Sequence, residues 1–374
     1  MHPAEGHDLV TLRSQIREVD AAIAGLVGRR QELARKIGEE KERLGLPVRD
    51  FETEKQVLQA AAREAERQGL ERDLLEGIAL HLIRGAVRLQ SRERSRRPSW
   101  PQGEGRPACV IGGGGHMGRW FLSFLASRGY RTGVVEAGDP IDDALAADLV
   151  VVAVDLASTA GVVDQLAVRR PRGTVLEISS LKSPLLDRAS GWVDGGMRFA
   201  SIHPMFGADA DLLAGQNLIV CQAGCPEAED EAALLFADSA VHVLRLPIAE
   251  HDRFMTWVLN LPHLVNLLAA DLLASSELPY ARLRELGGTT FNRQREVTAE
   301  VAAENPELYY SIQRLNRHRR ELFDAVRASL ERIAGDIEAG RREAFVARML
   351  GWENWFRGGE SADQRHSPPG PSGR

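Results

Sequence analysis

The stretch Ala108-Cys-Val-Ile-Gly-Gly-Gly-Gly-His-Met-Gly118 places a run of glycines directly after an apolar segment. Gly113, Gly115 and Gly118 have the spacing G-x-G-x-x-G, and the pattern from Trp120 to Leu125 is helical. In a strand–turn–helix unit, such glycines allow a tight turn, close approach of the backbone to a pyrophosphate, and close packing of helix on strand. The helix N-terminus would present free N–H groups to the phosphates. The stretch therefore predicts a dinucleotide site.

A second apolar segment, Thr132-Gly-Val-Val-Glu136, ends in a carboxylate about twenty residues further along the chain. An acid at that place usually binds the adenosine ribose 2′-hydroxyl and would repel a 2′-phosphate, which favours NAD over NADP as the cofactor. The residues expected to bind the cofactor are Gly113, Gly115, His116, Met117, Gly118 and Glu136.

The length of 374 residues leaves room for two or three domains. Because 44% of the residues are hydrophobic, the chain can bury the cores of a globular protein. A net charge of -6 argues against a nucleic-acid partner and against a bulk membrane surface. The three cysteines form neither a zinc pattern nor a disulfide framework, and no metal site is indicated. We find no signal peptide and no apolar run close to the roughly eighteen residues that span a membrane. We therefore expect a cytoplasmic protein.

Changes of pattern divide the chain into five segments. They are an all-helical domain (8–90), a charged linker rich in proline and glycine (91–107), an α/β Rossmann-like domain (108–246), an all-α domain (247–356) and a tail expected to be disordered (357–374). Short strands expected at 108–112, 131–136, 148–154, 174–178, 198–203 and 217–222 alternate with helices and predict a parallel, doubly wound sheet. Long helical stretches are expected at 249–274, 292–303 and 306–338.

Cations interrupt the apolar stripe of the long first helix. Arg30 and Lys41 lie eleven residues, three turns, apart and share one face, whereas Arg13 is turned by roughly 100° and would serve a different site. Long cations often extend from the edge of an apolar face into solvent, which would explain any single one of them. Three in one stripe, followed by Asp50 and Glu54, suit a pocket for a dianion.

The front segment resembles the all-helical class of chorismate mutase. The residues that carry the resemblance are Leu12-Arg13, Asp20, Arg30, Glu32-Leu33-Ala34, Lys41 and Pro47-Val48-Arg49-Asp50. It implies an intertwined dimer in which Arg30 and the partner chain's Arg13 bind the substrate carboxylates. It also implies that Lys41 and Gln90 hydrogen-bond the ether oxygen, and that Asp50 and Glu54 position the hydroxyl and ring. Thr53 and Ala86 depart from the family pattern, where an arginine and a serine are often found.

A second motif, Ser201-Ile-His-Pro-Met-Phe-Gly207, follows a predicted strand, at the edge of the sheet where doubly wound proteins bind ligands. Together with Ser180-x-Lys182 before it and Glu250-His-Asp252 after it, the motif resembles prephenate dehydrogenase. The similarity continues through Leu261-Pro-His263 and Asn305-Pro-Glu-Leu-Tyr-Tyr310. The order of the two resemblances matches the fused mutase–dehydrogenase family of tyrosine biosynthesis.

The second resemblance implies that His203 accepts the proton of the prephenate hydroxyl while hydride leaves the same carbon for the nicotinamide. Ser180 would support His203 and the nicotinamide end, and His263 would contact a substrate carboxylate or the ring. Lys182 is as readily structural as functional. Glu300 stands where the family generally has the arginine that grips the carboxylate, so Arg293, in preference to Arg295, is the expected substitute. This change leaves the related substrate arogenate open.

The favoured interpretation is an enzyme that converts chorismate to prephenate and then to 4-hydroxyphenylpyruvate. A dehydrogenase of prephenate or arogenate, whose front helices serve only dimerisation or regulation, is the alternative. An NAD-binding regulator without turnover is a third interpretation, and the intact Ser180 and His203 argue against it. Helical faces at both ends of the chain need partners, so we expect a homodimer.

Overall fold

The computed structural model describes residues 9–44, 51–96 and 103–363, apart from 209, 211, 212, 214, 215, 238 and 240. The chain divides into two compact units. One comprises residues 1–252 and 305–315, and the other comprises 253–304 and 316–374.

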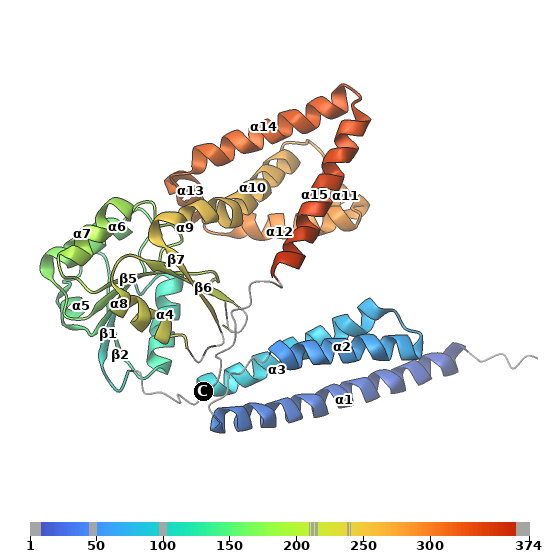
Figure 1. Cartoon of the computed structure of the whole chain (residues 1–374), viewed down its shortest axis with the longest axis horizontal. Helices are drawn as coiled ribbons and strands as arrows, with labels where there is room; N and C mark the ends of the chain where they lie inside the picture. The colour runs from blue at the N-terminus through green and yellow to red at the C-terminus, as the bar shows by residue number, and fades with distance from the viewer. Residues whose placement is uncertain are drawn as a thin grey trace, which may run out of the picture. The chain divides into compact units, whose positions relative to one another are not determined.

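Three helices form the front segment: α1 (Leu9–Arg43), α2 (Phe51–Gln68) and α3 (Arg72–Arg96). α3 packs against both α1 and α2, as the blue and cyan helices of Figure 1 show. Helix α3 continues to Arg96, so the predicted linker starts later than residue 91. Ala34 is the one buried residue of α1 among those described, and the apolar stripe of that helix stays largely exposed within the single chain.

Seven strands form one sheet in the order β2-β1-β3-β4-β5-β6-β7. Their bounds are β1 Pro107–Ile111, β2 Arg131–Val135, β3 Leu149–Val152, β4 Thr174–Glu177, β5 Phe199–Pro204, β6 Asn217–Gln222 and β7 His242–Pro247. β1, β3 and β4 are buried along nearly their whole length, as expected for strands covered by helices on each side, whereas the edge strand β2 is only partly buried. The predicted α/β doubly wound fold is confirmed.

The sheet is not wholly parallel, which corrects the prediction. β6 runs antiparallel to β5, with Ser201 opposite Cys221, and β7 then pairs parallel with β6. A parallel neighbour needs a crossover connection, usually a helix, and the described part of 205–216 contains none. β7 was not predicted from the sequence, because its mostly exposed residues lack the apolar alternation of a half-buried strand.

Helices cover both faces of the sheet. α4 (His116–Ser127) and α8 (Pro226–Leu234) pack into one core cluster, which is rich in phenylalanine. α5 (Asp142–Ala146), α6 (Thr159–Arg169) and α7 (Leu186–Asp194) pack into the other. This sandwich holds the carboxyl ends of β1, β4 and β5 rigidly at one edge of the sheet, where the candidate site residues lie.

The rest of the chain is helical: α9 (Ile248–Met255), a π-helical turn η1 (Thr256–Asn260), α10 (Leu261–Ala274), α11 (Tyr280–Leu286), α12 (Thr289–Ala303), α13 (Pro306–Leu315), α14 (Arg319–Glu338) and α15 (Arg342–Asp363). The stretch predicted at 306–338 is therefore interrupted at 316–318. The amide of the fully buried Asn316 donates hydrogen bonds to Thr256 Oγ1 and Asn260 Oδ1 in η1. These buried bonds explain why periodicity does not predict the interruption.

Helix α15 extends to Asp363, so the predicted disordered tail from 357 begins too early, and its part from 364 onward lies outside the described residues. One helical stretch, 248–274, is long and apolar enough to cross a membrane by length and composition alone, contrary to the expectation that none would be. A helix that packs against other protein surfaces passes the same test.

Candidate active sites

The glycine-rich turn after β1 has the geometry that a pyrophosphate requires. Gly112 has φ +83°, a left-handed conformation that side chains rarely adopt. A Cβ added at Gly118 would lie 2.1 Å from the carbonyl oxygen of Gly112, so only glycine lets α4 start this close to the turn. α4 begins at His116, with Gly115 as its N-cap residue. Gly112, which lies outside the G-x-G-x-x-G spacing, makes the tight turn.

Glu136 follows β2 and reaches the same turn. Its Oε1 accepts a hydrogen bond from the backbone N–H of Gly114 at 2.5 Å. An exposed carboxylate beside a turn built for phosphates fits a ribose diol and disfavours a 2′-phosphate. The residues present therefore fit NAD. His116 and Met117 lie in the first turn of α4, His116 exposed and Met117 partly buried against the core.

His203 lies at the carboxyl end of β5 and is almost completely buried. Its Nδ1 is 3.0 Å from Nε2 of His251, a residue of α9 that is fully buried. His251 Nδ1 is in turn 2.7 Å from Oδ1 of Asp252. Three ionisable side chains from two elements thus form one buried row. His251 and Asp252 belong to the stretch Glu250-His-Asp252, but the sequence alone assigns no role to either residue.

Asp252 also binds the loop that follows β4. Its Oδ1 accepts from the backbone N–H of Lys182 at 2.8 Å, and its Oδ2 accepts from the backbone N–H of Ser183 at 2.5 Å and from the Ser183 hydroxyl. The carboxylate therefore holds α9 and this loop together.

The side chain of Lys182 ties this loop to the ends of β4 and β5. Its Nζ is fully buried and donates to Glu177 Oε2 at 2.8 Å, to the Ser179 carbonyl at 2.7 Å and to the Ile202 carbonyl at 2.8 Å. Glu177 accepts a further bond from the Ser201 hydroxyl at 2.7 Å. All three protons of the ammonium are used inside the protein, so Lys182 is structural.

Ser180 stands on the same loop, three residues after the end of β4, and is partly buried. β4 and β5 are parallel neighbours with Glu177 opposite Ser201, so Ser180 and His203 follow adjacent strand ends. In the part of the chain that the structure describes, the ring of His203 hydrogen-bonds His251 and not Ser180. His251 therefore holds the ring of His203 here, and support of His203 by Ser180 stays a prediction.

Burial dominates the protonation of this cluster. It lowers the pKa of His203 well below 6.5, and nearby His251 and Lys182 add to that effect. Burial also lowers the pKa of His251, although its hydrogen bond to Asp252 opposes the shift. Burial alone would raise the pKa of Asp252, but the hydrogen bonds from His251, from Ser183 and from the backbone of Lys182 leave that pKa lowered. Near neutral pH the row therefore consists of two neutral imidazoles and one carboxylate.

The front helices enclose a second candidate site, a cavity of about 310 Å³. Its polar lining includes Arg30, Lys41 and Gln90, three residues that the sequence had grouped, together with Thr53; Ala86 also lines it. Arg30 Nη1 donates to the carbonyl of Leu82 at 2.8 Å, and the Gln90 amide donates to the carbonyl of Ala34 at 2.6 Å. These bonds hold a cation and an amide of different helices at one cavity.

Arg13 does not line this cavity and is exposed. It precedes Arg30 by seventeen residues of the same helix, a rise of about 25 Å, which is too far for one chain to use both at one substrate. Asp50 lies outside the described residues. Glu54 belongs to the first turn of α2, and its side chain is likewise outside them.

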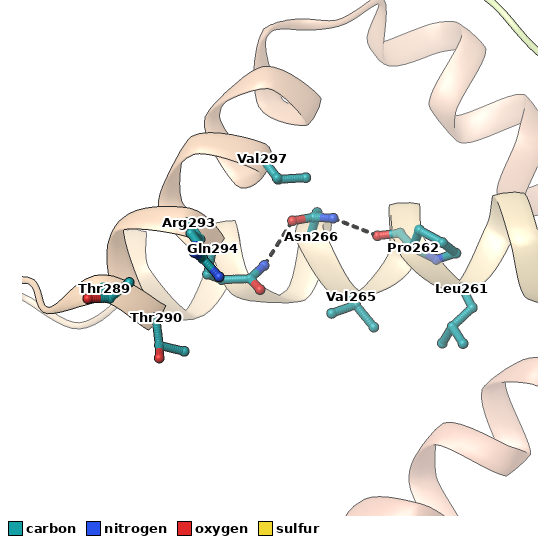
Figure 2. A pocket seen from close by; sticks show the side chains of 9 residues that line it. All are labelled: Leu261, Pro262, Val265, Asn266, Thr289, Thr290, Arg293, Gln294 and Val297. Atoms are coloured by element: carbon teal, nitrogen blue, oxygen red, sulfur yellow. Dashed lines mark hydrogen bonds between the residues drawn. The ribbon is translucent and has the colours of Figure 1, made fainter. Parts of the chain in front are cut away.

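The second unit contains a cavity of about 550 Å³ between α10 and α12 (Figure 2). It is lined by Leu261, Pro262, Val265, Asn266, Thr289, Thr290, Arg293, Gln294 and Val297. Gln294 donates to Asn266 Oδ1 at 2.9 Å, and the Asn266 amide donates to the Pro262 carbonyl at 2.9 Å. Arg293 therefore borders a cavity whose walls are held by hydrogen bonds.

Arg295 donates to the Tyr280 hydroxyl at 3.2 Å and to Glu296 at 3.3 Å, and it is absent from this cavity lining. Glu300 is exposed further along α12 and does not line the cavity either. His263 is partly buried in α10, and burial lowers its pKa.

Three protein families match the sequence. They are Chorismate mutase type II over residues 12–91, the nucleotide-binding domain of prephenate dehydrogenase over 123–239, and the dimerization domain of prephenate dehydrogenase over 247–350. A "T-protein" of Enterobacter agglomerans is 27% identical over 352 residues, which are 93% of each chain. A "T-protein" of Haemophilus influenzae is 24% identical over 356 residues, covering 93% of this chain and 92% of that protein.

Among solved structures, that of prephenate dehydrogenase from A. aeolicus in complex with hydroxyphenyl propionate and NAD+ is similar with a TM-score of 0.55. It is 18% identical and covers 66% of this chain and 96% of that one. At this identity the likeness concerns the fold.

Proposed function

The chain belongs to the family of fused chorismate mutases and prephenate dehydrogenases, and on this premise we propose that it performs two successive reactions. The first rearranges chorismate to prephenate. The second oxidises and decarboxylates prephenate to 4-hydroxyphenylpyruvate with NAD. The observation that carries this proposal is that a mutase domain and both domains of a dehydrogenase match one chain. Two T-proteins also match it over 93% and 92% of their own length.

The mutase reaction is a pericyclic rearrangement, so it needs a cavity that holds a compact conformer and stabilises charge on the breaking ether oxygen. Arg30 would bind a carboxylate, and Lys41 and Gln90 would donate to the ether oxygen. Their joint presence at one cavity of about 310 Å³ supports these roles. Arg13 of a second chain would supply the other carboxylate contact, and Asp50 and Glu54 would position the hydroxyl and ring.

In the dehydrogenase reaction, the glycine turn with His116 and Met117 would hold the pyrophosphate end of NAD, and Glu136 would bind the ribose. When bound, NAD supplies the acceptor for the hydride of the carbon that carries the hydroxyl. His203 would accept the hydroxyl proton, and its lowered pKa keeps it neutral and able to do so. Ser180 and His263 would contact the nicotinamide end and the substrate.

Arg293 is proposed as the substitute for the carboxylate-binding arginine. It borders a cavity, whereas Arg295 is bound to Tyr280 and Glu296, and Glu300 is exposed. Arg293→Gln should raise the KM for prephenate about tenfold or more, since a charge-assisted bond contributes about 1.5–3 kcal/mol. Arg295→Gln is the matched control. An unchanged KM in Arg293→Gln would exclude this residue as the carboxylate ligand.

We also propose a homodimer located in the cytoplasm, formed through the 247–350 domain and the front helices. Exposed apolar side chains of α10 and α1 support the interfaces; among them are Val265, Leu272, Ile16, Ile23 and Leu26. The domain limits 8–90, 108–246 and 247–356 follow from the changes of sequence pattern, and we propose them with the first extended to the end of α3 at Arg96 and the last to the end of α15 at Asp363.

The test follows chorismate loss and NADH formation in one reaction with purified protein and NAD. We expect chorismate to fall first and NADH to appear after it. His203→Asn should abolish NADH formation and leave chorismate loss intact, and Arg30→Ala should do the reverse. If NADH forms only when prephenate is supplied, the protein is a dehydrogenase whose front helices are structural. If NADH forms only from arogenate, then arogenate, and not prephenate, is the substrate of the dehydrogenase. Binding of NAD without NADH from either compound would indicate the regulator.

A further inference from the structure

The row from Asp252 through His251 to His203 determines where the protons lie. A carboxylate can only accept hydrogen bonds. Asp252 already accepts from the backbone N–H groups of Lys182 and Ser183, which stabilise its charged form. Its 2.7 Å contact with His251 Nδ1 therefore requires a proton on that nitrogen.

A neutral imidazole carries one proton, so His251 with a protonated Nδ1 has a bare Nε2. That nitrogen can only accept. It lies 3.0 Å from His203 Nδ1, which must then be the donor. Neutral His203 accordingly has its proton on Nδ1 and a free lone pair on Nε2.

We propose that His251 and Asp252 are positioning residues that hold His203 in the tautomer whose Nε2 accepts the proton of the substrate hydroxyl. The inference rests on the proposed dehydrogenase function. The proton moves from the hydroxyl oxygen to Nε2 of His203, and Nδ1 keeps its own proton and its bond to His251.

The same row stabilises the product of that step. A protonated His203 would be a buried cation, which is costly without a partner. His251 presents its lone pair to Nδ1, and the charge of Asp252 lies directly behind it. Since the backbone of Lys182 and Ser183 holds Asp252, the row needs no reorganisation when the charge forms. An orienting carboxylate acts through its histidine in this way in the serine-protease triad.

The network next to this row offers a matched control. Ser201 is also fully buried and hydrogen-bonds Glu177, but among the hydrogen bonds of the described residues none joins either of them to His203, His251 or Asp252. Ser201→Ala therefore removes a buried polar group of the same region without changing the tautomer.

The kinetic test compares His251→Leu, His251→Gln and Ser201→Ala in the full-length protein with prephenate and NAD. His251→Leu removes the acceptor, and kcat should fall by about 10²–10⁴-fold, in the range seen when an orienting residue is lost. The KM for prephenate and for NAD should change by less than about threefold, because the fully buried His251 side chain is not accessible to either ligand. In His251→Gln, Oε1 can accept near the position of Nε2, so most of kcat should return. Ser201→Ala should keep kcat within about twofold, and chorismate loss should be unchanged in all three.

A spectroscopic test reads the tautomer of His203 directly, with His251 and Asp252 unchanged. In protein labelled with 15N-histidine, the resonances absent from His203→Asn identify His203. We expect an Nδ1 that is protonated and an Nε2 that is not. A protonated Nε2, or a kcat of His251→Leu close to that of wild type, would overturn the proposal. If His251→Leu does not fold, the kcat of Asp252→Asn and the protonation of Nε2 in the wild-type spectrum test the proposal in its place. Absence of NADH formation by the wild type would reject the proposed function instead, and the tautomer can still be read in that case.

Discussion

At the scale of single residues, the hydrogen-bond partners of a buried side chain distinguish a structural group from a reactive one. Lys182 and Glu177 are both fully buried, and every proton of the Lys182 ammonium is bound within the protein. His203 is buried as well, but within the described part of the chain its Nδ1 alone has a hydrogen-bond partner, so Nε2 remains for a substrate. Two neighbouring side chains of similar burial thus differ in what they can do.

Lys182→Met should lower the free energy of unfolding of the Rossmann-like domain by about 3–5 kcal/mol, because it leaves Glu177 charged, buried and without its cation. Urea denaturation followed by tryptophan fluorescence would measure it. Arg172→Met, which removes an ion pair between the exposed Arg172 side chain and the partly buried Asp148, is the control and should change stability by less than about 1 kcal/mol. Equal stability of both variants would contradict the structural role of Lys182.

Stability should depend on the histidines below neutral pH. Burial lowers the pKa of His203, His251 and His263 in the folded protein, whereas in the unfolded chain they bind protons from about pH 6.5 downward. The unfolded state therefore gains protons first, and stability present above pH 6.5 is lost as the pH falls through this range. Urea midpoints at pH 7.5 and 5.5 would measure the loss. His263→Asn should reduce the difference, and a midpoint that rises on acidification would contradict the prediction.

At the scale of elements, two glycines permit close approaches on which the candidate sites depend. Gly118 allows the first turn of α4 to pack closely on the turn after β1. Gly38 of α1 is in close contact with the Gln90 side chain of α3. In both places an added Cβ would come closer than 3.0 Å to another atom, at Gly118 a backbone oxygen and at Gly38 the Cγ of Gln90. The two substitutions should therefore affect different reactions.

Gly118→Ala should abolish NADH formation and NAD binding, because the new Cβ forces α4 away from the turn. NAD titration by fluorescence and an assay of NADH formation would measure this. Chorismate loss should be unchanged. Gly191→Ala is the control, since a Cβ there meets nothing within 4 Å.

Gly38→Ala should slow chorismate loss at least about tenfold, because the new Cβ displaces Gln90 from a bond to the Ala34 carbonyl. Helix propensity alone would favour alanine by about 1 kcal/mol, so α1 should not unfold. Gly28→Ala in the same helix has nothing within 4 Å and should keep the activity. An unchanged rate of chorismate loss in Gly38→Ala would show that Gln90 takes no part in the mutase reaction.

At the scale of the whole molecule, the exposed apolar stripe of α1 argues that the front helices function as part of a larger assembly. Ile16, Ile23 and Leu26 are each more than half exposed in the single chain. Arg13 lies about 25 Å along α1 from Arg30, so a complete carboxylate site needs a second chain if Arg13 takes part.

Ile23→Lys should therefore lower the rate of chorismate loss and weaken the association between the front helices of two chains, since a charge would be buried at their interface. Analytical ultracentrifugation of the full chain at several concentrations would measure association, alongside chorismate loss. Val168→Lys, at an 82% exposed position of α6, is the control. A variant that stays dimeric with full mutase activity would contradict this interface.

The sequence by itself determined the features that depend on neighbours along the chain. The glycine turn, the acid after β2, the helical periodicity and the domain order are local patterns, because strands, turns and helix faces are set by spacing. The roles proposed for individual site residues stay predictions. Only the tertiary structure decided the antiparallel β6, the interruption at Asn316 and the row from Asp252 to His203. His251 and His203 are 48 residues apart in the chain. Their meeting depends on how α9, the loop after β4 and the end of β5 pack, which spacing along the chain does not encode.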